Sequence, residues 1–213
     1  HYTWISMWTR MITLPHTRGL QQYFCLNHAP ISMLSTLIGR KKITEAALAR
    51  ALTSGTMQAS EASFKEILSH IRTCPHFEKE PIISDGHDSP FILAIMTLNI
   101  SRVSSFLDSG PDKRMAQELL HEFATATSSD FRTVSLMVKD CKDQMKRLNR
   151  PSKNVYYGLA KYIFHAYGLN KYQQDYFRNM SAPNPLFLKE MNSILEPLVW
   201  DWEMILNEFK ITT

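Results

Sequence analysis

Side chains that could do chemistry are few in this sequence, and the densest group of them combines cysteine with histidine. Cys74, Pro75 and His76 are consecutive, and His70 and His87 lie close to them in the sequence. Thiolate and imidazole are ligands that zinc prefers, but a structural zinc site takes four ligands at compatible spacing, and no two recognised ligand pairs occur here. We therefore expect packing or solvated histidines, with no metal site and no cofactor.

A second pair, Cys25 and His28, is close enough in sequence for a thiolate–imidazole interaction of the cysteine-protease kind. Such enzymes bring the two residues together from distant parts of the chain, and no family signature surrounds Cys25. A buried structural thiol is the preferred interpretation. No P-loop, GxGxxG, HExxH or GxSxG motif is present either. The sequence leaves a helical hydrolase or transferase, with a site of scattered polar residues, as an alternative to the binding function considered below.

Residues 154–179 are rich in tyrosine, with lysine and arginine interleaved. This composition suits a stacking platform for single-stranded nucleic acid. Tyrosine also buries its ring and keeps its hydroxyl in water, so helix packing or a protein-binding surface is favoured. The formal net charge of the chain is +4, with both signs spread along it, which is too small and dispersed to imply nucleic acid. We expect a protein partner and no nucleic acid.

Composition limits the fold that must position these side chains. Only 7 of the 213 residues are glycine, while 44% are hydrophobic, which argues against a β-sandwich, a Gly-rich phosphate-binding fold and a disordered chain. Three cysteines without a CxxC motif fit reduced thiols, so a cytoplasmic location is expected. The longest apolar run is too short to insert into a membrane. The chain begins at His1, and we expect a tagged or excised piece of a longer protein, so an activity could lie outside it.

Glycine and proline punctuate an expected series of short helices. We expect a helix over 44–54 that ends at Gly55, a pair over 91–98 and 101–108 that ends at Gly110, and two helices within 154–179 that are separated at Gly168. Ser89 and Pro90 are typical of a helix start. We also expect one long last helix over 186–209, kinked at Pro197.

The segment 89–110 resembles one ankyrin repeat. The residues that carry the resemblance are Ser89-Pro90-Phe91-Ile92-Leu93-Ala94, then Val103, Phe106-Leu107 and Asp108-Ser109-Gly110. Ile92 and Leu98 depart from the family's histidine and glycine. Weaker candidates flank this repeat at Ala47-Leu48 to Leu68 and at Leu119-Leu120-His121 to Val138, so the resemblance covers roughly 44–141. A lone repeat cannot bury its face, which is why neighbours are expected.

The resemblance implies an all-α protein in which short helix pairs stack as an ankyrin-like solenoid with helical N- and C-terminal caps. Its parts would be an N-terminal cap over 1–43, degenerate repeats over 44–150 and a C-terminal helical bundle or cap over 151–213. It implies a protein–protein interaction module that binds through loop tips and inner helices. The implied contact residues are Asp85, Asp88, Met96, Thr97, Thr53, Ser54, Ala126 and Thr127.

Met96 is the expected apolar anchor of that surface. Irregular arrays of this kind resemble those that pathogens and large DNA viruses send against host proteins, so an effector or adaptor in a host cytosol is one expectation by analogy. A regulatory module that clamps an enzyme is another alternative. The sequence leaves the partner and the oligomeric state open.

Overall fold

The computed structural model describes residues 40–213, and its longest element is a helix near the start of that range. Strand β1 (Lys41–Thr44) leads into α3 (Glu45–Thr73), whose first turn is capped by the Thr44 hydroxyl, 3.2 Å from the Ala47 amide nitrogen. The expected helix end at Gly55 is wrong, because α3 continues through it. An interior glycine costs a helix only about 1 kcal/mol, which the packing of its apolar face outweighs.

Helix α4 (Ser89–Arg102) forms the centre of the core. Nine of its residues are buried, and α3, α5, α6 and α7 all pack against it. The expected break between residues 98 and 101 is wrong, since α4 is continuous and passes directly into a short 3-10 helix, η2 (Val103–Ser105). Burial on every side explains the apolar composition that the sequence shows here. Because α4 is continuous, the helix pair expected over 91–98 and 101–108, on which the ankyrin resemblance depends, does not form.

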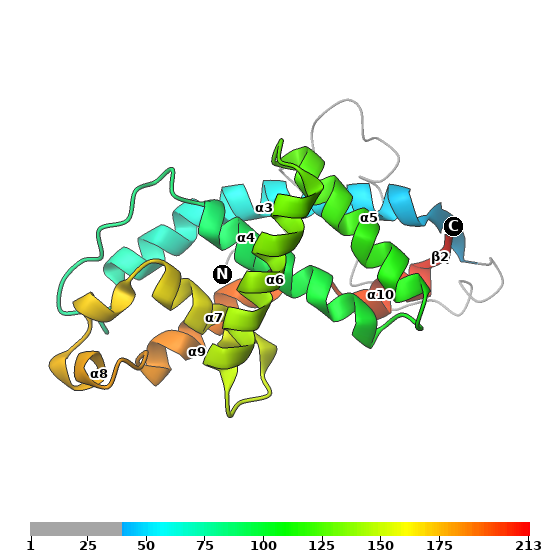
Figure 1. Ribbon diagram of the computed structural model, residues 1–213. Coiled ribbons are helices and arrows are strands. Elements are labelled where there is room, and N and C mark those ends of the chain that lie inside the picture. Colours follow the sequence, from blue (N-terminus) through cyan, green and yellow to red (C-terminus); the bar gives the residue numbers. More distant parts are fainter. Residues whose placement is uncertain (1–39) are drawn as a thin grey trace, which may run out of the picture.

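Three further helices cover α4. Helix α5 (Pro111–Ala126) follows Gly110, whose φ of 108° is a backbone conformation that favours glycine. Helix α6 (Phe131–Asn149) begins at Asp130, whose carboxylate accepts a hydrogen bond from the Thr133 amide, and it crosses in front of α4 in Figure 1. Helix α7 (Val155–Ala166) ends at Gly168, in the left-handed conformation with φ 60°, as the sequence predicts.

The C-terminal segment is more broken than expected. After η3 (Leu169–Tyr172) and α8 (Asp175–Asn179) come α9 (Pro185–Leu195), η4 (Glu196–Leu198), α10 (Trp202–Glu208) and strand β2 (Phe209–Thr212). The single kinked helix expected over 186–209 is therefore wrong. Pro197 has no amide hydrogen to donate, and it lies in the 3-10 turn where α9 has already ended.

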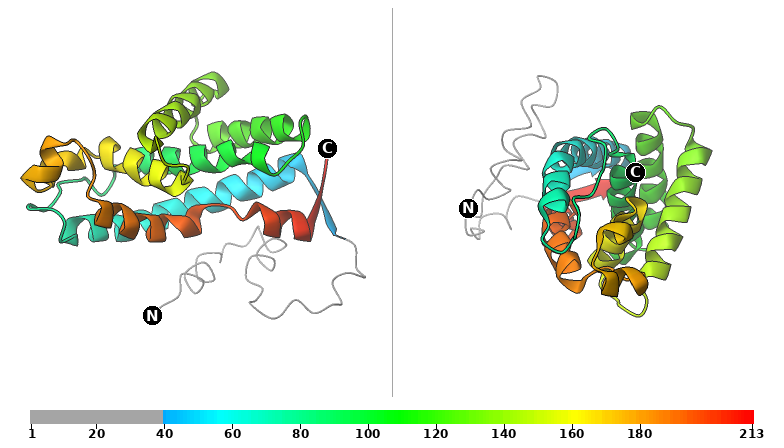
Figure 2. Two further views of the ribbon diagram at one scale, coloured as in Figure 1. Left: turned by 90° about the horizontal axis from the view of Figure 1, so that it is seen from below. Right: turned by 90° about the vertical axis from the view of Figure 1, so that its left-hand side faces the viewer.

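The two ends of the described chain are joined. β2 pairs in parallel with β1, Lys41 opposite Phe209 and Thr44 opposite Thr212, at one end of the molecule (Figure 1). From this sheet, α3 and the segment α9–α10 run side by side along the length of the molecule (Figure 2). In a solenoid each repeat contacts only its neighbours, whereas α4 here contacts α3, α5, α6 and α7. The expected stacking of repeats is therefore not confirmed. The all-α class is confirmed, with the small sheet as an addition.

The expected N-terminal cap over 1–43 lies almost wholly outside the described residues, as does Cys25. Within residues 40–213, no helix is both long and apolar enough to cross a bilayer.

Candidate functional site

Three of the contact residues expected from the sequence lie in the core. Met96 and Thr97 are both 0% exposed in α4, and Thr53 is buried in α3. The expectation that Met96 is an exposed apolar anchor is therefore wrong. The physical reason is that α4 has neighbours on all sides, so no inner-helix face is left open on it.

The other expected contact residues lie nearer the surface but on separate elements. Ser54 is exposed on α3, Asp85 lies in the segment that follows α3, and Ala126 and Thr127 are exposed at the end of α5. Asp88 is half-buried just before α4. Two residues of this set already have intramolecular partners. The Asp85 carboxylate accepts a hydrogen bond from the Arg72 guanidinium at 2.7 Å, and the Thr127 hydroxyl lies 2.9 Å from the Phe123 carbonyl oxygen. Ser54 and Ala126 each lie one helical turn beyond the Arg50–Glu122 ion pair, which links α3 to α5, whereas Asp85 and Asp88 lie in the segment between α3 and α4.

The outer side of α6 exposes apolar side chains that the sequence placed in a repeat. The helix packs on the core through every third or fourth residue, namely Val134, Val138, Cys141 and Met145. Leu136 and Met137 fall outside that spacing and remain 52% and 47% exposed. The spacing of the four core residues is the signal that would have found this face. We call Leu136 and Met137, together with the neighbouring cations Arg132 and Lys139, the α6 face.

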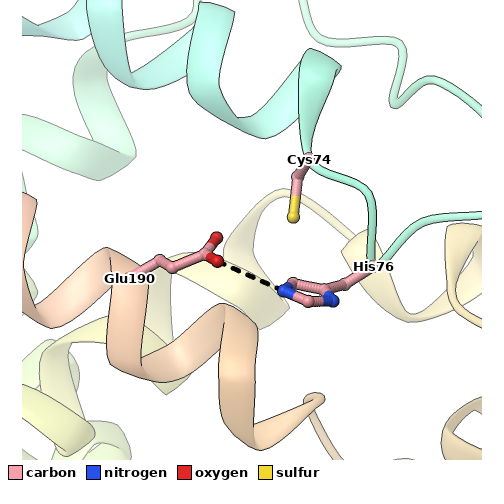
Figure 3. A group of neighbouring side chains, drawn as sticks. All are labelled: Cys74, His76 and Glu190. Carbon is pink, nitrogen blue, oxygen red and sulfur yellow. Dashed lines mark hydrogen bonds and ion pairs between the residues drawn. The ribbon is translucent and has the colours of Figure 1, made fainter.

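A compact group of metal-binding and nucleophilic side chains lies where α3 ends and α9 passes (Figure 3). Cys74 follows the last residue of α3, His76 lies two residues further on, and Glu190 projects from α9. Their ligand atoms all lie within 4.8 Å of one another. His76 Nε2 is 3.3 Å from Glu190 Oε1, and His70 Nε2 is 3.4 Å from Glu190 Oε2. We call Cys74, His76 and Glu190 the α3–α9 cluster.

The sequence identified part of this cluster. Cys74, His76 and His70 are close together in the chain, whereas Glu190 is 114 residues from His76 and only folding brings it there. No local signal could have indicated it. His87, which the sequence grouped with these residues, stacks edge to face on Tyr167 instead, with ring centroids 5.6 Å apart.

Burial dominates the electrostatics of the Cys74 thiol. Its pKa is raised, first because desolvation disfavours the thiolate and also because the Glu190 carboxylate is near, while the His76 backbone N–H opposes the shift. A raised pKa is the reverse of what a cysteine nucleophile needs. The set of thiol, imidazole and carboxylate is instead one that could hold a borderline-soft metal ion such as zinc.

The tyrosine-rich segment packs the C-terminal helices. Tyr167 and Tyr172 are buried, and both hydroxyls have backbone partners: that of Tyr167 donates to the His87 carbonyl at 2.7 Å, and that of Tyr172 accepts from the Ile82 amide at 3.1 Å. Burial also raises the pKa of Tyr167. These two rings are not available for stacking with bases, so the packing interpretation is confirmed for them.

No protein-family model, curated protein or solved structure matches this chain.

Proposed function

We propose that the protein is a protein–protein interaction module and that its docking surface is the α6 face. The partner would present an acidic amphipathic helix or an equivalent acidic, partly apolar segment. The observation that carries the proposal is the pair Leu136 and Met137, two large apolar side chains about half exposed on a helix that is otherwise anchored in the core.

The position of the helix supports this role. α6 lies at the outer edge of the described part of the molecule in both views of Figure 2, so a second helix can approach it without displacing any of the described elements. Helical spacing places Arg132, Leu136 and Lys139 on one side, because residues three and four apart are neighbours on a helix surface. An apolar centre with a charged rim is the usual composition of a protein interface.

Charge defines the chemistry of the partner. Residues 130–153 contain seven Lys and Arg against three Asp, a net charge of +4 that equals the formal net charge of the whole chain. None of these seven cations takes part in an ion pair among the described residues. Unpaired cations beside apolar side chains favour an acidic partner, mainly by speeding association and by excluding basic competitors.

The same surface would serve the effector or adaptor role expected from the sequence, with a host protein as the partner. A regulatory role is equally compatible, if the acidic segment belongs to an enzyme.

The proposal is tested by affinity capture from the native cellular context with three forms of the full chain. Leu136→Glu combined with Met137→Glu removes the apolar centre and repels acidic groups. Met204→Glu is the matched control, because Met204 is 45% exposed on α10, away from α6. We expect a protein that binds the wild type and Met204→Glu, is lost with the double variant and dissociates as salt is raised.

Equal recovery by all three forms would contradict the proposal. Loss of binding with Met204→Glu alone would move the docking surface to α10. Recovery of nucleic acid in place of protein, sensitive to nuclease, would assign the cations of α6 to a different class of partner.

A further inference from the structure

We propose that the α3–α9 cluster is a zinc-binding site in which Cys74 Sγ, His76 Nε2 and one carboxylate oxygen of Glu190 are the ligands. The site is independent of the α6 face and goes beyond the proposed protein-binding function. Among the residues that the structure describes, this is the group in which three potential ligand atoms converge.

The separations fit the dimensions of a tetrahedral zinc site. With zinc–nitrogen and zinc–oxygen bonds of about 2.0–2.2 Å, two ligands at the tetrahedral angle are about 3.4 Å apart, and a sulfur ligand is about 3.6 Å from the others. The observed distance from His76 Nε2 to Glu190 Oε1 is 3.3 Å. The sulfur, within 4.8 Å of the other ligand atoms, needs only a small side-chain movement to complete the set.

The directions of the side chains agree with these distances. In Figure 3 the Cys74 sulfur points into the space between the Glu190 carboxylate and the His76 ring. Two of the ligands come from one short segment after α3, and the third comes from α9. A bound ion would therefore tie the end of α3 to α9, two elements that are far apart in the sequence.

His70 is the positioning residue of the site. Its Nε2 atom is enclosed by the protein and lies 3.4 Å from the second oxygen of Glu190, but it makes no hydrogen bond with good geometry in the described structure. It therefore contacts the second carboxylate oxygen while His76 contacts the first, and it is placed to fix the orientation of the carboxylate. Partners of this kind, outside the ligand set, commonly change metal affinity by about 10- to 100-fold.

The ligand types select the metal. Magnesium and calcium prefer sites made only of oxygen, whereas a thiolate with an imidazole and one carboxylate suits zinc. Three protein ligands leave a fourth position for water or for a group from another molecule. Binding requires the Cys74 thiol to release its proton, which the ion itself would promote.

The experiment measures metal content and uses the full chain. The protein is stripped with chelator, incubated with zinc, passed through a desalting column and analysed for bound metal. We expect about one zinc per chain for the wild type, as a single centre of this kind holds. Cys74→Ser, His76→Ala and Glu190→Gln should each lose it, and His70→Ala should weaken it by about 10- to 100-fold.

Two controls match the ligand variants. Cys141 is the other free, buried cysteine among the described residues, and Cys141→Ser should keep the zinc. Glu203 is an exposed carboxylate on α10, and Glu203→Gln should keep it as well. Zinc retained by Cys74→Ser and His76→Ala at the wild-type level would overturn the proposal, and unchanged affinity in His70→Ala would remove the positioning role of His70.

A measurement on the wild type decides the matter even if a variant fails to fold. Cobalt(II) bound by a thiolate gives a charge-transfer absorption in the near ultraviolet, and tetrahedral coordination gives strong visible bands. We expect both when cobalt is added to the stripped wild-type chain, and we expect zinc to displace them. If neither band develops, or if both persist in Cys74→Ser, the site does not exist.

Discussion

The buried side chain of Asn99 offers the sharpest test of the packing that holds the C-terminal segment against α3 and α4. Its amide nitrogen donates to the Leu198 carbonyl at 3.0 Å, and its oxygen accepts from the Trp200 amide at 2.8 Å. Trp200 in turn donates from its indole nitrogen to the Thr56 hydroxyl at 2.7 Å. Through these bonds α4 holds the extended segment between η4 and α10 against α3.

Asn99→Ala should destabilise the fold substantially. It removes both hydrogen bonds and leaves a buried carbonyl and a buried amide without partners, each worth about 1–3 kcal/mol. The expected loss is therefore about 2–5 kcal/mol of the free energy of unfolding. For a domain of this size, that corresponds to a fall in Tm of roughly 5–20 °C.

Urea denaturation followed by circular dichroism measures this loss directly. Asn207→Ala is the matched control, because Asn207 is exposed on α10, and it should change stability by less than about 0.5 kcal/mol. Asn99→Asp should be as damaging as Asn99→Ala, since it places a charged oxygen against the Leu198 carbonyl. A loss below about 1 kcal/mol for Asn99→Ala would refute the idea that this network holds the C-terminal segment.

Three further predictions follow from burial. Met96→Glu should abolish the cooperative thermal transition, because it buries a charge in the centre of α4. A variant that still folds and binds a partner would show that Met96 is exposed at the surface. Leu136→Glu with Met137→Glu should change the free energy of unfolding by less than about 0.5 kcal/mol per site, and a larger loss in urea denaturation would show that α6 needs these side chains for packing. Cys141 should be alkylated at neutral pH only as urea unfolds the protein, because the thiol is buried and burial raises its pKa; fast labelling of its peptide in the native protein, measured by mass spectrometry, would contradict this.

The sequence predicted the fold class and several helix ends, because these depend on local chemistry. Scarce glycine indicated helices, Ser89 and Pro90 marked the start of α4, and Gly168 marked the end of α7. It did not predict that α3 continues through Gly55 or that α4 continues past residue 98. Both errors have the same cause, since tertiary packing outweighs the local preference of a single residue.

The candidate sites were accessible from the sequence to different degrees. Cys74, His76 and His70 lie in one short segment, so their proximity could be predicted from the sequence. Glu190 lies in a helix that is distant in the sequence, so its place beside them could not be predicted. The α6 face required the period of the helix to be assigned correctly, because the four core residues of α6 are three or four apart and Leu136 and Met137 fall outside that spacing.

Photo-crosslinking from a single position tests the central claim, that the α6 face contacts a partner, most directly. A photoreactive amino acid is placed at position 136 of the full chain in the native cellular context, and at position 204 in a control chain. We predict a specific crosslinked protein from position 136 that is absent from position 204 and depends on the neighbouring cations, so that Lys139→Glu with Lys142→Glu weakens it. Crosslinks from position 204 with none from position 136 would contradict the account.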